Sequence, residues 1–155
     1  MQLEYFQMID RILDLNMVEK TITVEAQVPN TSPVFEGHFP GYPIMPGVLL
    51  IESMAQTSGW LLLALMKFER MPFLAAVKEA KMRGFVAPGE LLTIEAGVLH
   101  EGSGYAMTEA KIKIGGKLKC NATLTFSHVP FPNPDLRGHM DAVAKRIGFP
   151  SQAIA

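Results

Sequence analysis

His38 and Glu52, in the first half of the sequence, have the chemistry of a proton-transferring pair. His38 lies in a segment dense in proline and glycine, where a loop can present its ring with little backbone obstruction. Histidine is the side chain that exchanges protons most readily near neutral pH. Glu52 lies in an apolar stretch, and we expect burial there to favour its protonated, acid form. Each residue alone also has a structural explanation, as an exposed loop histidine or a paired structural carboxylate.

Gly47 and Gln56 add two further groups to this pair. Pro46-Gly47 precedes a long apolar segment and should begin a helix, whose first amides have no internal acceptor and carry partial positive charge. Such amides can stabilise a developing oxyanion, and glycine lets a substrate approach the backbone closely. Gln56 follows Glu52 by four residues and Gly59 follows by seven, so one helix face stays polar or small. That face could be a slot for substrate, although an ordinary Pro-Gly turn also explains Gly47.

A base, an acid and an oxyanion donor together describe the removal of water from a β-hydroxy thioester. The base takes the α-proton, the acid converts hydroxide into leaving water, and the donor stabilises the enolate oxygen. This reaction needs no metal. The remaining histidines, His100, His128 and His139, have no metal-ligand spacing, so we predict no metal site.

A long helix must position Glu52. The segment from Gly47 to about Arg70 is long and apolar, and its polar residues favour a buried helix of a soluble protein over a membrane span. We expect a short helix over residues 3–13. The proline and glycine content of Asn30 to Gly47 predicts a loop without regular structure.

Alternating apolar residues predict about five strands around this helix. The expected strands are Thr21–Val28, Phe73–Val77, Leu91–His100, Ala106–Ile114 and Leu118–Phe126, with a turn at Gly115-Gly116. One long apolar helix and an antiparallel sheet define an α+β domain in which the sheet wraps around the helix. Because one sheet leaves part of the helix uncovered, we expect a second chain to close the other side.

The sequence predicts that the C-terminal part of the chain forms a segment of its own. Three prolines between 130 and 134 form a stiff connector, and Asp135 could cap a short helix. Leu136, Met140, Val143 and Ile147 would share one face of that helix. We therefore expect a core domain over residues 1–129 and a C-terminal extension over residues 130–155, either part of the same domain or appended to it.

Composition narrows the class of protein. The chain has 155 residues, a net charge of -1 and 19% charged residues, which gives no reason to expect disorder or a nucleic-acid partner. The single cysteine, Cys120, excludes an internal disulfide and fits a reducing compartment. The first ten residues lack the basic region of a secretory signal. We expect a cytoplasmic protein without membrane insertion.

The stretch from Gly37 to Gln56 resembles the hallmark of the FabZ-type 3-hydroxyacyl-[acyl-carrier-protein] dehydratases of type II fatty-acid synthesis. It contains Gly-His-Phe-Pro-Gly, Pro-Ile-Met-Pro-Gly-Val-Leu and Ile-Glu-Ser-Met-Ala-Gln, and the resemblance extends over about residues 5–128. A second block resembles the family at Lys81-Met-Arg83 and at Val86-Ala-Pro88-Gly89-Glu90.

The resemblance implies a role for each residue of the site. His38 would be the catalytic base and Glu52 the catalytic acid, while the Gly47 amide would bind the thioester carbonyl. The Ile44 carbonyl would fix the tautomer of His38, and Gln56 would orient Glu52.

The resemblance also implies a fold, an assembly and a carrier. The family has the hot-dog fold and forms homodimers, often assembled into trimers of dimers, whose sites combine His and Glu from different chains. Its substrate arrives on the phosphopantetheine arm of an acyl carrier protein, and no other cofactor is implied. Lys78, Lys81 and Arg83 could dock that carrier, or could form an ordinary solvated face.

Two other functions remain open. Dehydratase-isomerases of this kind carry Asp at the acid position and usually Trp before the Gln, so Glu52 and Ala55-Gln56 favour the simple dehydratase. A catalytically silent hot-dog subunit that binds acyl carrier protein would not need intact His38 and Glu52. The extension beyond residue 129 resembles variants that serve very-long-chain acyl synthesis for outer-membrane lipid such as lipid A.

Overall fold

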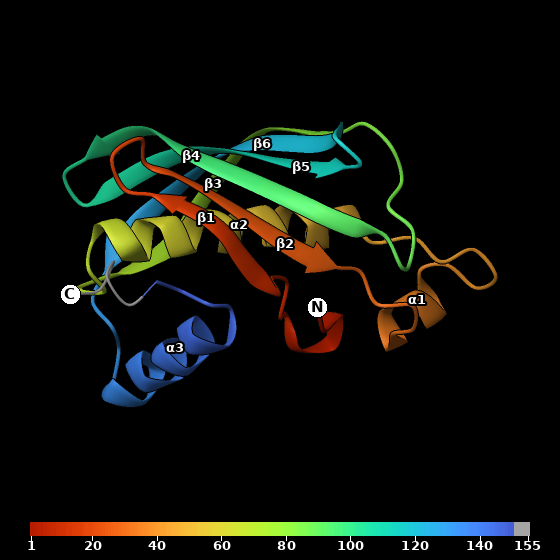
Figure 1. Ribbon diagram of the computed structural model, residues 1–155, viewed down its shortest axis with the longest axis horizontal. Coiled ribbons are helices and arrows are strands. Elements are labelled where there is room, and N and C mark those ends of the chain that lie inside the picture. Colours follow the sequence, from red (N-terminus) through yellow and green to blue (C-terminus); the bar gives the residue numbers. More distant parts are fainter. Residues whose placement is uncertain (151–155) are drawn as a thin grey trace.

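A six-stranded antiparallel sheet curves around one long helix in the computed structural model (Figure 1), which describes residues 1–150. This arrangement confirms the predicted α+β class and is the one expected of the hot-dog fold. The described elements are η1 (Leu3–Tyr5), β1 (Arg11–Asn16), β2 (Thr21–Gln27), α1 (Pro33–Gly37), α2 (Gly47–Leu65), β3 (Met71–Met82), β4 (Leu91–Gly102), β5 (Tyr105–Ile114), β6 (Lys117–Val129) and α3 (Pro134–Arg146).

The strands follow the order β1-β2-β4-β5-β6-β3. Their alternating apolar residues point toward α2, as the sequence pattern predicts, because successive side chains of a strand point to opposite faces. In β2 the buried residues are Ile22, Val24 and Ala26, and β5 and β6 alternate in the same way. The two outermost strands are β1 and β3, so each has one edge without a partner strand in the described chain.

Helix α2 is the core of the molecule. It is the one helix of the described chain long and apolar enough to span a membrane, but 72% of that window is buried inside the fold. Its hydroxyl groups are satisfied within the protein: Ser53 and Thr57 donate to helix carbonyls, and Thr108 of β5 donates to Ser58 at 2.8 Å. The apolar surface of α2 therefore packs against the sheet.

Several predicted boundaries were wrong. The helix predicted over residues 3–13 is only the short η1, and from Arg11 onward the chain forms β1, which pairs with β2. The loop before Gly47 includes α1, which Ser32 caps by accepting a hydrogen bond from the Val34 amide. Helix α2 ends at Leu65, not near Arg70. The strand predicted at Phe73–Val77 is the twelve-residue β3, and the sheet has six strands.

The C-terminal extension packs onto the domain. Helix α3 lies on the side of α2 that faces away from the sheet (Figure 1), and its N-cap is Asn133 rather than Asp135. Phe149 packs at right angles on Phe68, with 5.3 Å between ring centroids, and lies 5.9 Å from Trp60. A second chain was expected to cover the whole open side of α2, but α3 of the same chain covers part of it.

The first half of α2 remains open. Val48 is 72% exposed, and Ile51, Glu52 and Gln56 are partly exposed. Nearby, the free edge of β3 exposes apolar side chains, including Phe73 at 59%. An unpaired strand edge with exposed apolar residues is a template for pairing with another chain.

Candidate active site

His38 is held at the C-terminal end of α1. Its amide donates to the Val34 carbonyl, and Gly41, with a φ of +75°, completes the turn in which Phe39 and Tyr42 exchange backbone hydrogen bonds. The ring Nδ1 of His38 lies 3.0 Å from the Ile44 carbonyl oxygen. A carbonyl can only accept, so Nδ1 must carry the hydrogen, which leaves the lone pair of Nε2 free to accept a proton. The pair His38–Ile44 expected from the sequence is thus formed.

Glu52 is held by Gln56 from the next turn of α2. The Gln56 amide nitrogen donates to Glu52 Oε1 at 2.9 Å and to the Phe6 carbonyl at 2.7 Å. Its amide oxygen accepts from the Met8 backbone at 3.3 Å. Gln56 therefore fixes the carboxylate from one side and is itself fixed by the N-terminal segment. Glu52 is only partly buried in the described chain, so the burial predicted from the apolar sequence around it is incomplete.

The N-terminal segment was missed as part of the site. Phe6 and Met8 contribute only backbone groups to Gln56, so their side-chain types carry no signal for that role. Residues 3–13 were predicted as a helix, which would have kept these backbone groups in its own hydrogen bonds. Because the chain instead turns from η1 into β1, a carbonyl and an amide become available to Gln56.

Gly47 supplies the first amide of α2. In residues 1–150 that amide donates no hydrogen bond, as its position at the helix start leads one to expect. The three atoms nearest to a β-carbon built on Gly47 all belong to the Met82 side chain, at 3.7 Å or more. Steric crowding therefore does not require glycine at this position. The group available to a substrate here is the free backbone amide.

A groove opens beside Glu52. It has a volume of about 510 Å³, within the range of small-molecule sites. Glu52, Gln56 and Gly59 line it along one face of α2, as the slot hypothesis predicted. His38 is not among its lining residues. The described chain thus forms the pairs His38–Ile44 and Glu52–Gln56 but does not bring both into this groove.

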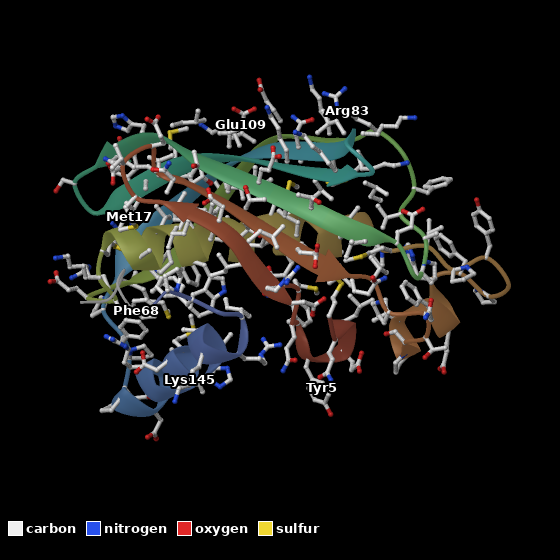
Figure 2. The ribbon with its side chains drawn as sticks, in the orientation of Figure 1. Tyr5, Met17, Phe68, Arg83, Glu109 and Lys145 are labelled. Atoms are coloured by element: carbon white, nitrogen blue, oxygen red, sulfur yellow. The ribbon has the colours of Figure 1, made fainter. Side chains whose placement is uncertain are left out.

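The basic residues at the end of β3 are exposed. Lys78 and Lys81 lie within the strand, not after it as predicted, and Arg83 follows it directly. Arg83, labelled in Figure 2 on the upper surface of the sheet, donates from Nε to the Asn121 side chain at 3.0 Å. Lys119 lies beside Gly84 and adds a fourth cation, which could not be predicted from the spacing of the other three because it comes from β6.

The two groups with shifted pKa values, His128 and Cys120, do not line the groove. The described residues contain no cluster of three or more His, Cys, Asp or Glu that could hold a metal ion. Burial lowers the pKa of His128, with a further contribution from Arg70. Cys120 is buried in β6, and burial raises the pKa of its thiol to about 11.

Comparisons with known proteins agree with this fold and motif. The family model described as a FabA-like domain matches residues 1–123. The 3-hydroxyacyl-[acyl-carrier-protein] dehydratase FabZ of Levilactobacillus brevis is 39% identical over 76% of this chain and 79% of its own. The enzyme of the same name from Koribacter versatilis is 37% identical over 81% of both chains.

Solved structures share the fold at lower identity. A hypothetical thioesterase from Streptococcus pneumoniae, solved with coenzyme A, aligns with a TM-score of 0.63 over 79% of this chain and 88% of its own, at 18% identity. A conserved protein from Pseudomonas aeruginosa aligns with a TM-score of 0.62 over 77% of this chain and 87% of its own, at 24% identity.

A helix wrapped by an antiparallel sheet, with a loop histidine and a carboxylate on the helix, defines a class of hot-dog proteins equipped for proton transfer. The sequence matches are far more specific than the structural ones. The chain belongs to the FabA-like family, and within it to the FabZ-type dehydratases.

Proposed function

We propose that this protein dehydrates (3R)-3-hydroxyacyl-[acyl-carrier-protein] to the trans-2-enoyl product in type II fatty-acid synthesis. The observation that carries the proposal is the 3.0 Å contact between His38 Nδ1 and the Ile44 carbonyl, which requires a hydrogen on Nδ1 and so makes Nε2 the base of the neutral ring. Glu52, oriented by Gln56, supplies the complementary acid. The FabZ enzymes that are 37–39% identical to this chain carry this activity in their names.

The proposed reaction follows from these groups. His38 Nε2 removes the α-proton, and the electron pair moves toward the thioester carbonyl, whose growing negative charge the Gly47 amide stabilises. The electrons then form the Cα–Cβ double bond as the Cβ–O bond breaks, and Glu52 protonates the departing hydroxyl to give water. The two proton transfers leave His38 protonated and Glu52 ionised, so both must exchange protons before the next turnover.

The open half of α2 supports a homodimer with shared sites. His38 and the Glu52 groove are not joined in the described chain, and the exposed β3 edge lies next to the groove through Met71–Leu74. In the proposed dimer a partner paired on this face supplies its own His38 to the Glu52 of the first chain, and two-fold symmetry makes the second site equivalent. Such dimers could assemble further into trimers of dimers.

The carrier protein would dock on the basic cluster of Lys78, Lys81 and Arg83. These side chains are exposed, and acyl carrier proteins are acidic, so charge attraction would speed their encounter. Reversal of Lys81 and Arg83 to Glu should weaken turnover of carrier-bound substrate and reduce its salt dependence. Turnover of a short pantetheine thioester should barely change, and equal losses on both substrates would contradict the docking role.

The absorbance of the enoyl thioester tests the activity directly. Purified protein should raise this absorbance when given a 3-hydroxyacyl thioester and lower it when given crotonyl thioester, because hydration is the reverse reaction. A cis-3-enoyl product would indicate the dehydratase-isomerase instead. No change with either substrate would indicate a silent carrier-binding subunit. We place the enzyme in the cytoplasm, consistent with its single buried thiol.

A further inference from the structure

Helix α3 forms a wall of the groove that contains Glu52. One side of the groove consists of the Glu52 face of α2, and the opposite side includes Met140 and Val143 of α3. Figure 1 shows α3 beside α2, on the side away from the sheet, next to the N-terminal η1. The family model ends at residue 123, so these wall residues lie outside the part of the chain that matches the family.

The groove has a polar part and an apolar part. Its polar lining residues are Gln7, Glu52, Gln56, His139 and Arg146. The walls between them are mainly apolar, and several are aromatic or aliphatic side chains of α2, β3, β6 and α3: Trp60, Leu63, Phe73, Leu74, Phe126, Met140 and Val143. A ligand that fits this surface has a reactive polar group near Glu52 and an apolar chain continuous with it.

Helix α3 is fixed firmly enough to act as a wall. Arg137 donates to the Phe68 carbonyl at 2.6 Å, and its guanidinium lies 5.0 Å from the centroid of the Phe68 ring. At the other end, the Ile147 carbonyl accepts from the Ile12 amide of β1 at 2.8 Å. Ala144 and Ile147 are buried against the domain. Both ends of α3 are thus tied to the core, which keeps Met140 and Val143 at a set distance from α2.

We infer that α3 forms part of the acyl-binding groove and that Met140 and Val143 help to determine which acyl chains the enzyme accepts. The inference rests on the proposed function, because the thioester must react at Glu52. From that point, the apolar walls offer the alkyl chain of a 3-hydroxyacyl substrate a path out of water, and burial of each methylene is favourable. A short acyl chain would end before it reaches α3, whereas a long one would contact it.

A substitution that fills the groove tests this role. Val143→Trp should reduce kcat/KM for a sixteen-carbon 3-hydroxyacyl thioester by at least about tenfold, because the added ring occupies the apolar channel. Turnover of the four-carbon substrate should stay within about twofold of wild type. Ala142→Trp is the matched control, since Ala142 is exposed on the same helix and does not line the groove. It should leave both substrates unaffected.

Val143→Phe adds a smaller ring and should give the same chain-length dependence if the Trp variant does not fold. Equal activity of wild type and the filled variants on all chain lengths would overturn the inference. An equal loss on all lengths, together with dissociation of a dimer in size-exclusion chromatography, would also overturn it, because a second copy of the chain would then occupy this part of the groove.

A binding measurement separates this inference from the proposed function. Calorimetry with hexadecanoyl-pantetheine amide, which cannot be dehydrated, reports occupancy of the groove without any turnover. Binding that Val143→Trp weakens and Ala142→Trp preserves would support the acyl groove even if wild type failed to dehydrate any substrate. Binding that neither substitution changes would overturn the groove assignment even if wild type were an active dehydratase.

Discussion

The two halves of α2 differ in what lies against them. From Thr57 to Ala64 every residue is buried, under the sheet on one side and near the aromatic cluster of Trp60, Phe68 and Phe149 on the other. From Gly47 to Gln56 the helix alternates buried residues with partly exposed ones, and Glu52 and Gln56 belong to the exposed set. One half holds the domain together, and the other presents reactive groups to a surface that this chain does not complete.

The two halves of α2 are held in place by different kinds of contact. In the second half of α2, many apolar contacts fix each side chain, and no single contact is essential. In the first half, a few directed hydrogen bonds fix Glu52 and Gln56. Substitutions in the first half should therefore change activity far more than stability, and those in the second half should do the opposite.

Removal of the reactive groups should have the largest effect. His38→Ala and Glu52→Gln should each reduce turnover by a factor of about 10² or more, because each removes a proton-transfer group. Both residues are only partly buried in the described chain, so circular dichroism and thermal unfolding should stay close to wild type. A folded His38→Ala protein with near-normal turnover would show that the loop histidine is not the base.

Truncation of a buried side chain in the second half of α2 should mainly affect stability. Leu62 is 1% exposed, and Leu62→Ala should reduce the free energy of unfolding by about 2–5 kcal/mol because it leaves a cavity. Urea unfolding measures this loss, while turnover per folded molecule should remain near wild type. A large fall in turnover without loss of stability would mean that the two halves of α2 are not separate in function.

Gln56 should give an intermediate effect on activity. Gln56→Met keeps the side-chain length but removes both hydrogen bonds from its amide nitrogen, so Glu52 loses its orientation. We expect kcat to fall by about tenfold with a smaller change in KM, because the reacting groups become less well oriented. Gln56→Glu is the matched comparison, since it keeps the shape but places a second carboxyl beside Glu52. A change in KM alone would point to a substrate-binding role instead.

Cys120 should give the smallest effect, and only at high pH. Burial raises the pKa of its thiol from 9.0 to about 11, so the folded protein favours the neutral form. The unfolded chain ionises first as the pH rises, and the stabilisation from this thiol is therefore lost between about pH 9 and pH 11. Urea unfolding at pH 8 and at pH 10.5 measures the free energy of unfolding at each pH. Between these two values it should fall further for wild type than for Cys120→Ala. Identical losses would contradict the burial of this thiol.

The sequence predicted the sheet well where strands alternate strictly. In β2, β5 and β6 one face is buried, so the period of two is visible in the residues themselves. It found only the first part of β3, because every residue of this edge strand from Val77 to Met82 is exposed and the register shifts between Lys78 and Lys81, so no alternation marks that part. It also failed for residues 3–13, where apolar residues at helical spacing belong to η1, a turn and β1.

The candidate site was predictable only in part. The twenty-residue motif places His38, Ile44, Gly47, Glu52 and Gln56 close together in sequence, and the structure forms the hydrogen bonds expected within each pair. The support from Phe6 and Met8, and the wall formed by α3, depend on tertiary packing between segments far apart in the chain. No local pattern marks a backbone carbonyl as the partner of a side chain about fifty residues away.

A mixed-chain experiment tests most directly whether a second chain completes the open half of α2. His38→Ala and Glu52→Ala proteins, each inactive alone, are unfolded, mixed in equal amounts and refolded, and the formation of mixed dimers is verified with two affinity tags. In a mixed dimer with shared sites, one site receives both altered residues and the other receives both intact ones. Half of the dimers are mixed, so activity should return to about a quarter of wild type. No return of activity in verified mixed dimers would show that His38 and Glu52 act within one chain.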